Sequence, residues 1–158
     1  MTRTIERSIE IDASPDLVWR VLTDLPSHPD WNPFIREISG DVAIGARLRV
    51  HITPPGKRGM TFQPVVTAAT PGRELAWLGK LGVRGIFDGA HRFRIEDLGG
   101  GRSRVTQGET FTGVLVPLLG GSLNATAEGF DQMNQALKAR CEDLATADPT
   151  GDVSATED

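Results

Sequence analysis

The sequence predicts an α+β domain in which a curved antiparallel sheet of about seven strands surrounds one long C-terminal helix. Three observations lead to this prediction. Apolar and polar residues alternate along 4–11 and along much of 35–112, which is typical of strands buried on one face. Apolar residues then recur at helical spacing between about Leu118 and Leu144. Finally, the order of strand, short helices, six strands and long helix does not fit alternating βαβ units.

The first strand and the short helices after it are predicted from local signals. Ile5, Ile9 and Ile11 share one face of an extended segment. Ser14 can cap a following helix, and Pro15 suits the first helical position. Residues 25–34 are too rich in proline for a long helix. We therefore expect a helical turn or loop there, anchored by its two large aromatic side chains.

The remaining strands are predicted from alternation and from the turns between them. Thr70-Pro71-Gly72 has the composition of a tight turn, and residues 98–102 form a glycine-rich loop. Each turn should close a hairpin. The predicted strands cover 35–40, 46–53, 60–70, 73–81, 86–97 and 103–112.

Length and composition indicate one folded domain, predicted over residues 1–146, with an acidic mobile tail over 147–158. The chain has 158 residues and a net charge of −4, and its Lys and Arg residues are scattered. We therefore expect no nucleic acid partner, since phosphate binding needs a concentrated basic face. No apolar run approaches the length of a transmembrane segment. Together with a single cysteine, Cys141, this favours a cytoplasmic location. We expect a monomer or a homodimer.

The most informative polar residues lie on the two longest strands. Alternation places His91 on the same face as Phe87 and Phe93, and Gln107 and Glu109 on the same face as Phe111. Buried polar groups need partners. Two interpretations remain open: a structural His–Glu pair inside the core, or polar anchors inside a cavity that holds a ligand.

The same inward face supplies the candidate binding residues, because aromatic side chains alternate with glycines that leave gaps in curved strands. No catalytic or nucleotide-binding motif is present, and the spacing of the three histidines predicts no metal site. We expect no cofactor. The candidate catalytic residues are His91, Glu109 and Gln107, and the candidate ligand-binding residues are Trp31, Phe34, Phe62, Val66, Leu75, Trp77, Phe87, His91, Phe93, Gln107, Glu109, Phe111, Phe130, Met133 and Asn134.

Several segments of the chain resemble the START-like, or SRPBCC, superfamily, and especially its small bacterial members described as polyketide cyclase/dehydrase-like or lipid-transport-like. The resemblance runs from about Thr4 to Leu144. It is carried by the segments 9–15, 18–19, 31–34, 71–77, 89–93, 109–113 and 133–138.

The resemblance implies a helix-grip fold, but it leaves the activity open because one scaffold serves carriers, sensors, cyclases and oxygenase subunits. Rieske-type oxygenase subunits bring metal ligands and an iron–sulfur domain that this sequence lacks. Cyclase members place polar side chains in the cavity to guide an aldol closure. Here only His91, Gln107 and Glu109 could do so.

Three hypotheses follow for the function. The first is binding of a small hydrophobic molecule (a lipid, polyketide or aromatic metabolite) between the sheet and the C-terminal helix. The second is a cyclase or dehydratase in which His91 and Glu109 act as acid and base. The third is a fully packed domain whose surface binds another protein. The volume of the interior distinguishes the third from the other two.

Overall fold

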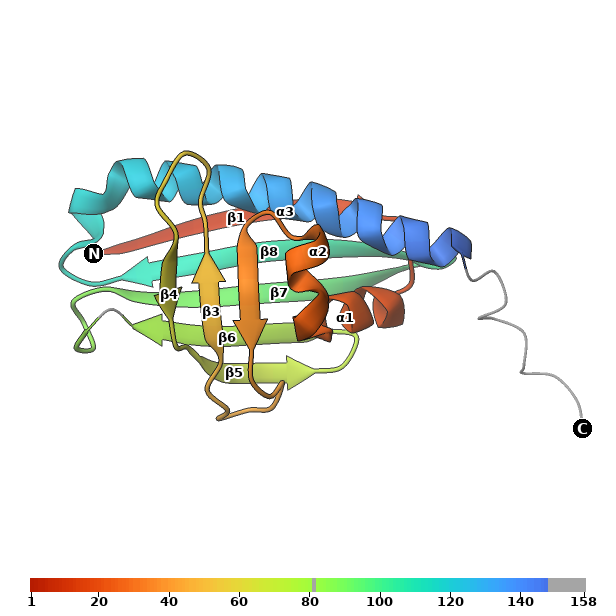
Figure 1. The fold of residues 1–158 in the computed structure, drawn as a ribbon, viewed down its shortest axis with the longest axis horizontal. Coiled ribbons are helices and arrows are strands. Elements are labelled where there is room, and N and C mark those ends of the chain that lie inside the picture. The colour runs from red at the N-terminus through yellow and green to blue at the C-terminus, as the bar shows by residue number, and fades with distance from the viewer. Residues whose placement is uncertain (81, 148–158) are drawn as a thin grey trace, which may run out of the picture.

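The computed structural model, which describes residues 1–80 and 82–147, shows two antiparallel sheets and a long helix (Figure 1). The five-stranded sheet has the order β1-β8-β7-β6-β5, and the three-stranded sheet has the order β2-β3-β4. The elements in chain order are β1 (Thr2–Ile11), α1 (Pro15–Thr23), η1 (Leu25–Ser27), α2 (His28–Trp31), β2 (Ile35–Ser39), β3 (Arg49–Ile52), β4 (Met60–Phe62), β5 (Val65–Thr70), β6 (Glu74–Lys80), β7 (Asp88–Gly99), β8 (Arg102–Thr112), η2 (Val116–Leu119) and α3 (Gly120–Ala147). The predicted fold class is confirmed.

Helix α1 begins as the sequence predicts. Ser14 lies in extended conformation, and its side-chain oxygen accepts a hydrogen bond from the backbone N–H of Leu17 at 3.3 Å. Pro15 occupies the first turn, where it sacrifices no helical hydrogen bond. The helix buries Val18, Val21 and Leu22 against the core.

The proline-rich segment contains two short helices, η1 and α2, and it is held by a buried histidine. His28 is 2% exposed, although its sequence context suggested a loop. Its Nε2 lies 2.9 Å from the carbonyl oxygen of Leu22, and its Nδ1 lies 3.0 Å from Nδ2 of Asn32. Asn32 also accepts hydrogen bonds from the backbone N–H groups of Phe34 and Ile35. The imidazole is therefore neutral, donating through Nε2 and accepting at Nδ1.

The predicted strand over 60–70 is two strands that belong to different sheets, so the described part of the chain forms eight strands. Strand β4 pairs with β3, and β5 pairs with β6. Pro64 lies between them and has no N–H to continue a ladder. Its carbonyl oxygen instead accepts a hydrogen bond from the backbone N–H of Leu48 at 2.8 Å. The chain therefore passes from one sheet to the other at this proline.

Both predicted hairpins are present. The backbone N–H of Arg73 donates to the carbonyl of Thr70, and Gly72 has φ +71°, as a tight turn between β5 and β6 requires. Strands β7 and β8 extend to Gly99 and from Arg102, so only two residues join them. The predicted strand over 73–81 ends at Lys80 in the structure, and residue 81 lies outside the described residues, as does the acidic segment from residue 148 on.

Helix α3 runs along the sheet, and loop 53–59 contacts it (Figure 1). The prediction placed its start at about Leu118, but residues 116–119 form η2 and the helix begins at Gly120. Gly129 faces Phe34 and Pro55 so closely that an added Cβ would lie 2.4 Å from the Phe34 ring. Loop 53–59 and α3 therefore lie against each other at this point.

Burial of His28 predicts a specific loss of stability in acid. Desolvation lowers the pKa of His28 in the folded chain, outweighing the Leu22 carbonyl and Asp24, which raise it. Because the folded-state pKa lies below the unfolded value of about 6.5, stability is full above that pH and falls as the pH drops toward the folded-state pKa. Between pH 7.5 and 5.5 this one group should remove up to about 1.4 kcal/mol of unfolding free energy.

The comparison with a His28→Gln variant isolates this contribution, because glutamine keeps one donor and one acceptor but does not titrate. Urea unfolding of both proteins at the two pH values measures it. The native chain should lose more stability than the variant. Equal losses would show that His28 does not resist protonation in the folded state.

Candidate functional site

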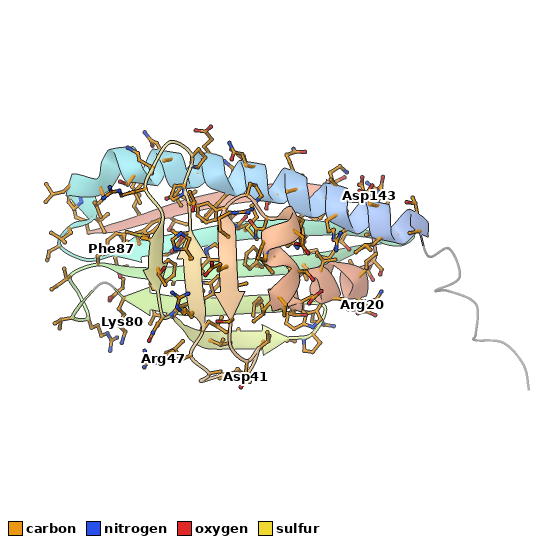
Figure 2. All side chains as sticks on the ribbon, in the orientation of Figure 1. Arg20, Asp41, Arg47, Lys80, Phe87 and Asp143 are labelled. Carbon is orange, nitrogen blue, oxygen red and sulfur yellow. The ribbon has the colours of Figure 1, made fainter. Side chains whose placement is uncertain are left out.

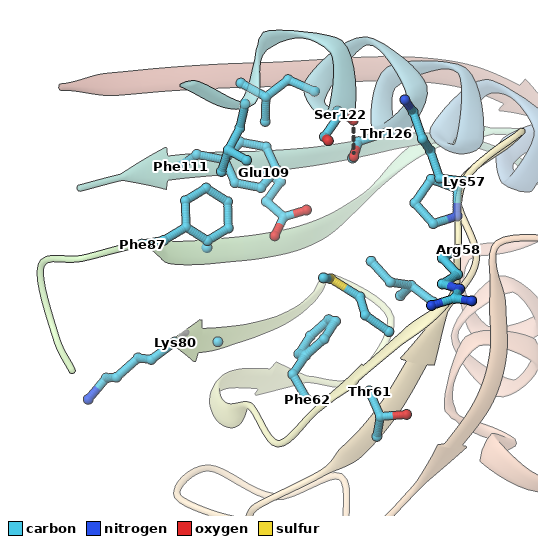
Figure 3. A pocket seen from close by; sticks show the side chains of 17 residues that line it. Lys57, Arg58, Thr61, Phe62, Lys80, Phe87, Glu109, Phe111, Ser122 and Thr126 are labelled. Carbon is cyan, nitrogen blue, oxygen red and sulfur yellow. Dashed lines mark hydrogen bonds between the residues drawn. The ribbon is translucent and has the colours of Figure 1, made fainter. Parts of the chain in front are cut away.

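A pocket of about 380 Å³ opens at one end of the layer between sheet and helix (Figure 3). Its walls come from β3, β4 and the loop between them, from the adjoining ends of β6, β7 and β8, and from η2 and the first turns of α3. Most of the lining is apolar. The residues that line it are Ile52, Pro54, Lys57, Arg58, Met60, Thr61, Phe62, Gly79, Lys80, Phe87, Gly89, Glu109, Phe111, Leu119, Ser122, Leu123 and Thr126.

Three aromatic rings of the predicted set form the pocket walls. Phe87, the residue before β7, stacks on Phe111 of β8 with the ring centroids 5.5 Å apart at an angle of 21°. Phe62 lies on β4, above Gly79 of β6, where a Cβ would lie 3.4 Å from the phenyl ring. The glycine thus lets a ring from one sheet approach the backbone of the other.

Among the residues that the structure describes, Glu109 is the one acidic side chain that lines the pocket. Its side chain is 15% exposed, and Figure 3 shows its carboxylate directed toward the space between Phe87 and Phe62. The carboxylate also occupies space above Gly89, where an added Cβ would lie 2.5 Å from Oε1. Gly89 therefore allows the carboxylate to lie along the wall.

Behind Glu109, a chain of polar contacts runs into the core. Oε2 of Glu109 lies 3.4 Å from Nδ1 of His91, which is 4% exposed. Nε2 of His91 lies 3.3 Å from Nε2 of Gln107, and this amide nitrogen also lies 3.4 Å from Sδ of Met133. With the amide in this orientation, Gln107 donates to Nε2 of His91, so that Nδ1 carries the proton and donates to Glu109.

This arrangement brings the three predicted catalytic candidates together but gives only one of them access to the pocket. Gln107 is fully buried, and its Oε1 has no hydrogen-bond partner within residues 1–80 and 82–147. His91 stacks on Trp77 with centroids 4.9 Å apart and an angle of 10°. The imidazole is thus held by Trp77 on one face of its ring and by polar contacts at both of its nitrogens. Chemically, Glu109 can accept a hydrogen bond or a proton from a group in the pocket, while His91 orients its carboxylate.

Beyond His91, aromatic rings fill the interior. The His91 ring lies 4.7 Å from Phe93 and 5.1 Å from Phe130, and Trp77 lies 5.7 Å from Phe93. We call Trp77, His91, Phe93 and Phe130 the aromatic plug. All four side chains are at most 4% exposed. The layer between sheet and helix is therefore packed at the plug, and the pocket lies on the Glu109 side of it.

The predicted ligand-binding residues divide between those that line the pocket and those that do not. Phe62, Phe87, Glu109 and Phe111 line the pocket. The other members of the predicted set do not line it, and they lie in the packed core or against it. Those residues are Trp31, Phe34, Val66, Leu75, Trp77, His91, Phe93, Gln107, Phe130, Met133 and Asn134.

Sequence reasoning missed the part of the pocket that comes from loops and helix ends. Lys57 and Arg58 come from the β3–β4 connection, and Met60 is the first residue of β4. Leu119 ends η2, and Leu123 lies in the first turn of the long helix. Strand alternation does not place loop residues. One signal in the sequence could have indicated these loop residues. It is the pair of cations, Lys57 and Arg58, that follows the turn Pro54-Pro55-Gly56 between two predicted strands.

Cys141 is not a candidate nucleophile. It is fully buried on α3, and burial, with Glu142 beside it, raises the pKa of its thiol to about 12. Thiolate chemistry therefore has no support at this position. Within residues 1–80 and 82–147, no three His, Cys, Asp or Glu side chains gather in a way that could hold a metal ion. In the same part of the chain, no helix is long and apolar enough to cross a membrane.

Comparison with known structures places the fold. An aromatase/cyclase, ZhuI from Streptomyces sp. R1128, matches with a TM-score of 0.74 at 18% identity, over 97% of this chain and 100% of its own. A START superfamily protein from Mycobacterium smegmatis matches with a TM-score of 0.70 at 20% identity, over 89% and 98%. The di-domain aromatase/cyclase StfQ of the steffimycin biosynthetic pathway matches with a TM-score of 0.73 at 14% identity, over 92% and 53%. No curated protein matches the sequence.

These similarities confirm the START-like helix-grip fold that the sequence segments predicted. A family model described as "Polyketide cyclase / dehydrase and lipid transport" matches residues 2–142, which cover most of the chain and every element of the pocket. The chain therefore belongs to the polyketide cyclase/dehydrase and lipid transport family.

Proposed function

We propose that this chain binds a small, largely hydrophobic molecule, such as a lipid, polyketide or aromatic metabolite, in the pocket beside Glu109. The observation that carries the proposal is a hollow of about 380 Å³ walled by Phe62, Phe87 and Phe111. Ligand pockets commonly have volumes of roughly 300–1,000 Å³, with apolar walls and few polar groups. An interior with this much space counts against a fully packed domain that works only through its surface.

The side chains that line the pocket also indicate the shape and the polar groups of the ligand. Stacked aromatic walls favour flat or extended apolar groups. Glu109 favours a hydroxyl or amide donor at the part of the ligand that reaches the strand wall. The family description and the similar aromatase/cyclases agree with a molecule of this kind.

A blocking substitution tests the proposal. Ser122 lies at the pocket edge on α3, so Ser122→Trp should place an indole in the opening. We expect at least a tenfold loss of affinity for a fluorescent fatty acid, and for 1-naphthol, measured by titration. Asn124→Trp is the matched control, because Asn124 is exposed on the same helix but does not line the pocket.

Native mass spectrometry of the purified chain, followed by extraction, searches for the natural ligand. The proposal fails if no apolar compound is carried and neither probe is taken up. It also fails if both tryptophan variants bind the probes as the native chain does, since binding would then lie elsewhere.

A second candidate function rests on Glu109 itself. A carboxylate on an apolar wall, oriented by a buried imidazole 3.4 Å away, is placed to act as a general base. In a cyclase reaction, Glu109 would take a proton from a carbon next to a carbonyl. The enolate carbon would bond to a second carbonyl carbon, and the resulting alkoxide would take the proton back. No oxidant, reductant or metal ion is needed for this aldol step.

Glu109→Gln separates catalysis from binding. It preserves shape but removes the base, so the rate of cyclisation of a poly-β-ketone thioester should fall by roughly 10²–10⁴-fold. Probe affinity should change little. Glu6→Gln, on the neighbouring strand and outside the pocket, is the control. No turnover by the native chain, or equal turnover by the Glu109 variant, would leave binding as the function.

A further inference from the structure

Two loops at the pocket end of the molecule carry large apolar side chains that are open to solvent. Val83 and Ile86, between β6 and β7, are 70% and 37% exposed. Val114 and Leu118, between β8 and α3, are 72% and 78% exposed. We call these four residues the apolar tip.

The two segments that carry the apolar tip are joined through their backbones. The backbone N–H groups of Val114 and Leu115 donate to the carbonyls of Gly85 and Ile86, each at 3.2 Å. Gly113 packs so closely on this loop that an added Cβ would lie 2.3 Å from the Ile86 oxygen. The two loops are therefore held side by side. Single exposed apolar residues need no explanation, but a joined group of them marks an interaction site.

The apolar tip borders the pocket opening. Ile86 is followed by Phe87, and Leu118 by Leu119, and the second member of each pair lines the pocket. Each segment thus turns one side chain toward the ligand space and its neighbour toward solvent. Figure 2 shows Phe87 and Lys80 at this end of the molecule, with Arg20 and Asp143 at the opposite end.

Three cations and one carboxylate line the same opening, although the chain as a whole has a net charge of −4. The segments 53–59, 82–87 and 113–119 contain no Asp or Glu. Lys57, Arg58 and Arg84 lie on these segments, and Lys80 lines the pocket beside them. Among the described residues, none of these four cations takes part in an ion pair.

From these observations we propose that the apolar tip, together with the four cations named above, docks the pocket opening on an anionic lipid membrane. Side chains that are 70–78% exposed project from the surface, as insertion among lipid chains requires. Lys and Arg beside them contact acidic headgroups. A second copy of the chain is disfavoured as the occupant, because symmetric pairing would bring two sets of cations together. The bilayer supplies both complementary features.

Co-sedimentation with vesicles tests the proposal. Vesicles of equal parts phosphatidylcholine and phosphatidylglycerol should bind the chain, and pure phosphatidylcholine vesicles should bind it far less. Added salt should weaken the binding. Replacing both Val114 and Leu118 by Asp should reduce the bound fraction at least tenfold. Ile44→Asp is the matched control, since Ile44 is 72% exposed on the segment between β2 and β3.

Charge removal gives an independent readout. Lys57→Gln with Arg58→Gln should lower vesicle partitioning by about fivefold for each charge removed. Arg20→Gln with Arg73→Gln, outside the pocket, should leave it unchanged.

The outcome is separable from that of the proposed function. Val114 and Leu118 do not line the pocket, so the Asp variant should keep its affinity for the fluorescent fatty acid in solution. The docking proposal is overturned if vesicles do not bind the chain, or if the Val114 and Leu118 variant binds them normally. It is equally overturned if sedimentation velocity shows that Val114 and Leu118 mediate dimer formation. The same holds if these two residues are required for binding an acidic protein but not for binding vesicles.

Discussion

The packing of Trp77, His91, Phe93 and Phe130 is the constraint on which the rest of the structure depends. These rings bridge the five-stranded sheet and α3 and exclude solvent from the middle of the molecule. Aromatic pairs at such distances add stability beyond simple burial. Because the plug sets the separation of sheet and helix, the space that remains lies at one end, where the strands continue past the packed rings.

A polar chain links the plug to that space. Met133, Gln107, His91 and Glu109 are connected by contacts of 3.3–3.4 Å, and the last of them reaches the pocket. The sequence left two interpretations open, a structural His–Glu pair and polar anchors in a cavity. In the structure, His91 and Gln107 are core residues that contact each other, whereas Glu109 contacts His91 and lines the pocket. The imidazole is a positioning residue, since it acts on the pocket through the carboxylate.

The sequence predicted which side chains face inward but not how deep each one lies. Period-two alternation assigned His91, Glu109 and Phe111 to the inner face, and the structure agrees. The same pattern treats Phe93 and Phe87 alike, although one is in the plug and the other walls the pocket. Depth depends on where the helix crosses the sheet and on Pro64, which sends β4 and β5 to different sheets. These are tertiary effects that local patterns do not contain.

The interior is divided into a packed part, at the aromatic plug, and a hollow part, at the pocket. Xenon distinguishes the two directly, because it enters apolar cavities. Crystals of the chain should be pressurised with xenon and compared with untreated crystals. Xenon density beside Phe62, Phe87 and Leu123, with none between Phe93, Phe130 and Met133, is the expected result. Xenon among the latter three, or none beside the former, would contradict the account.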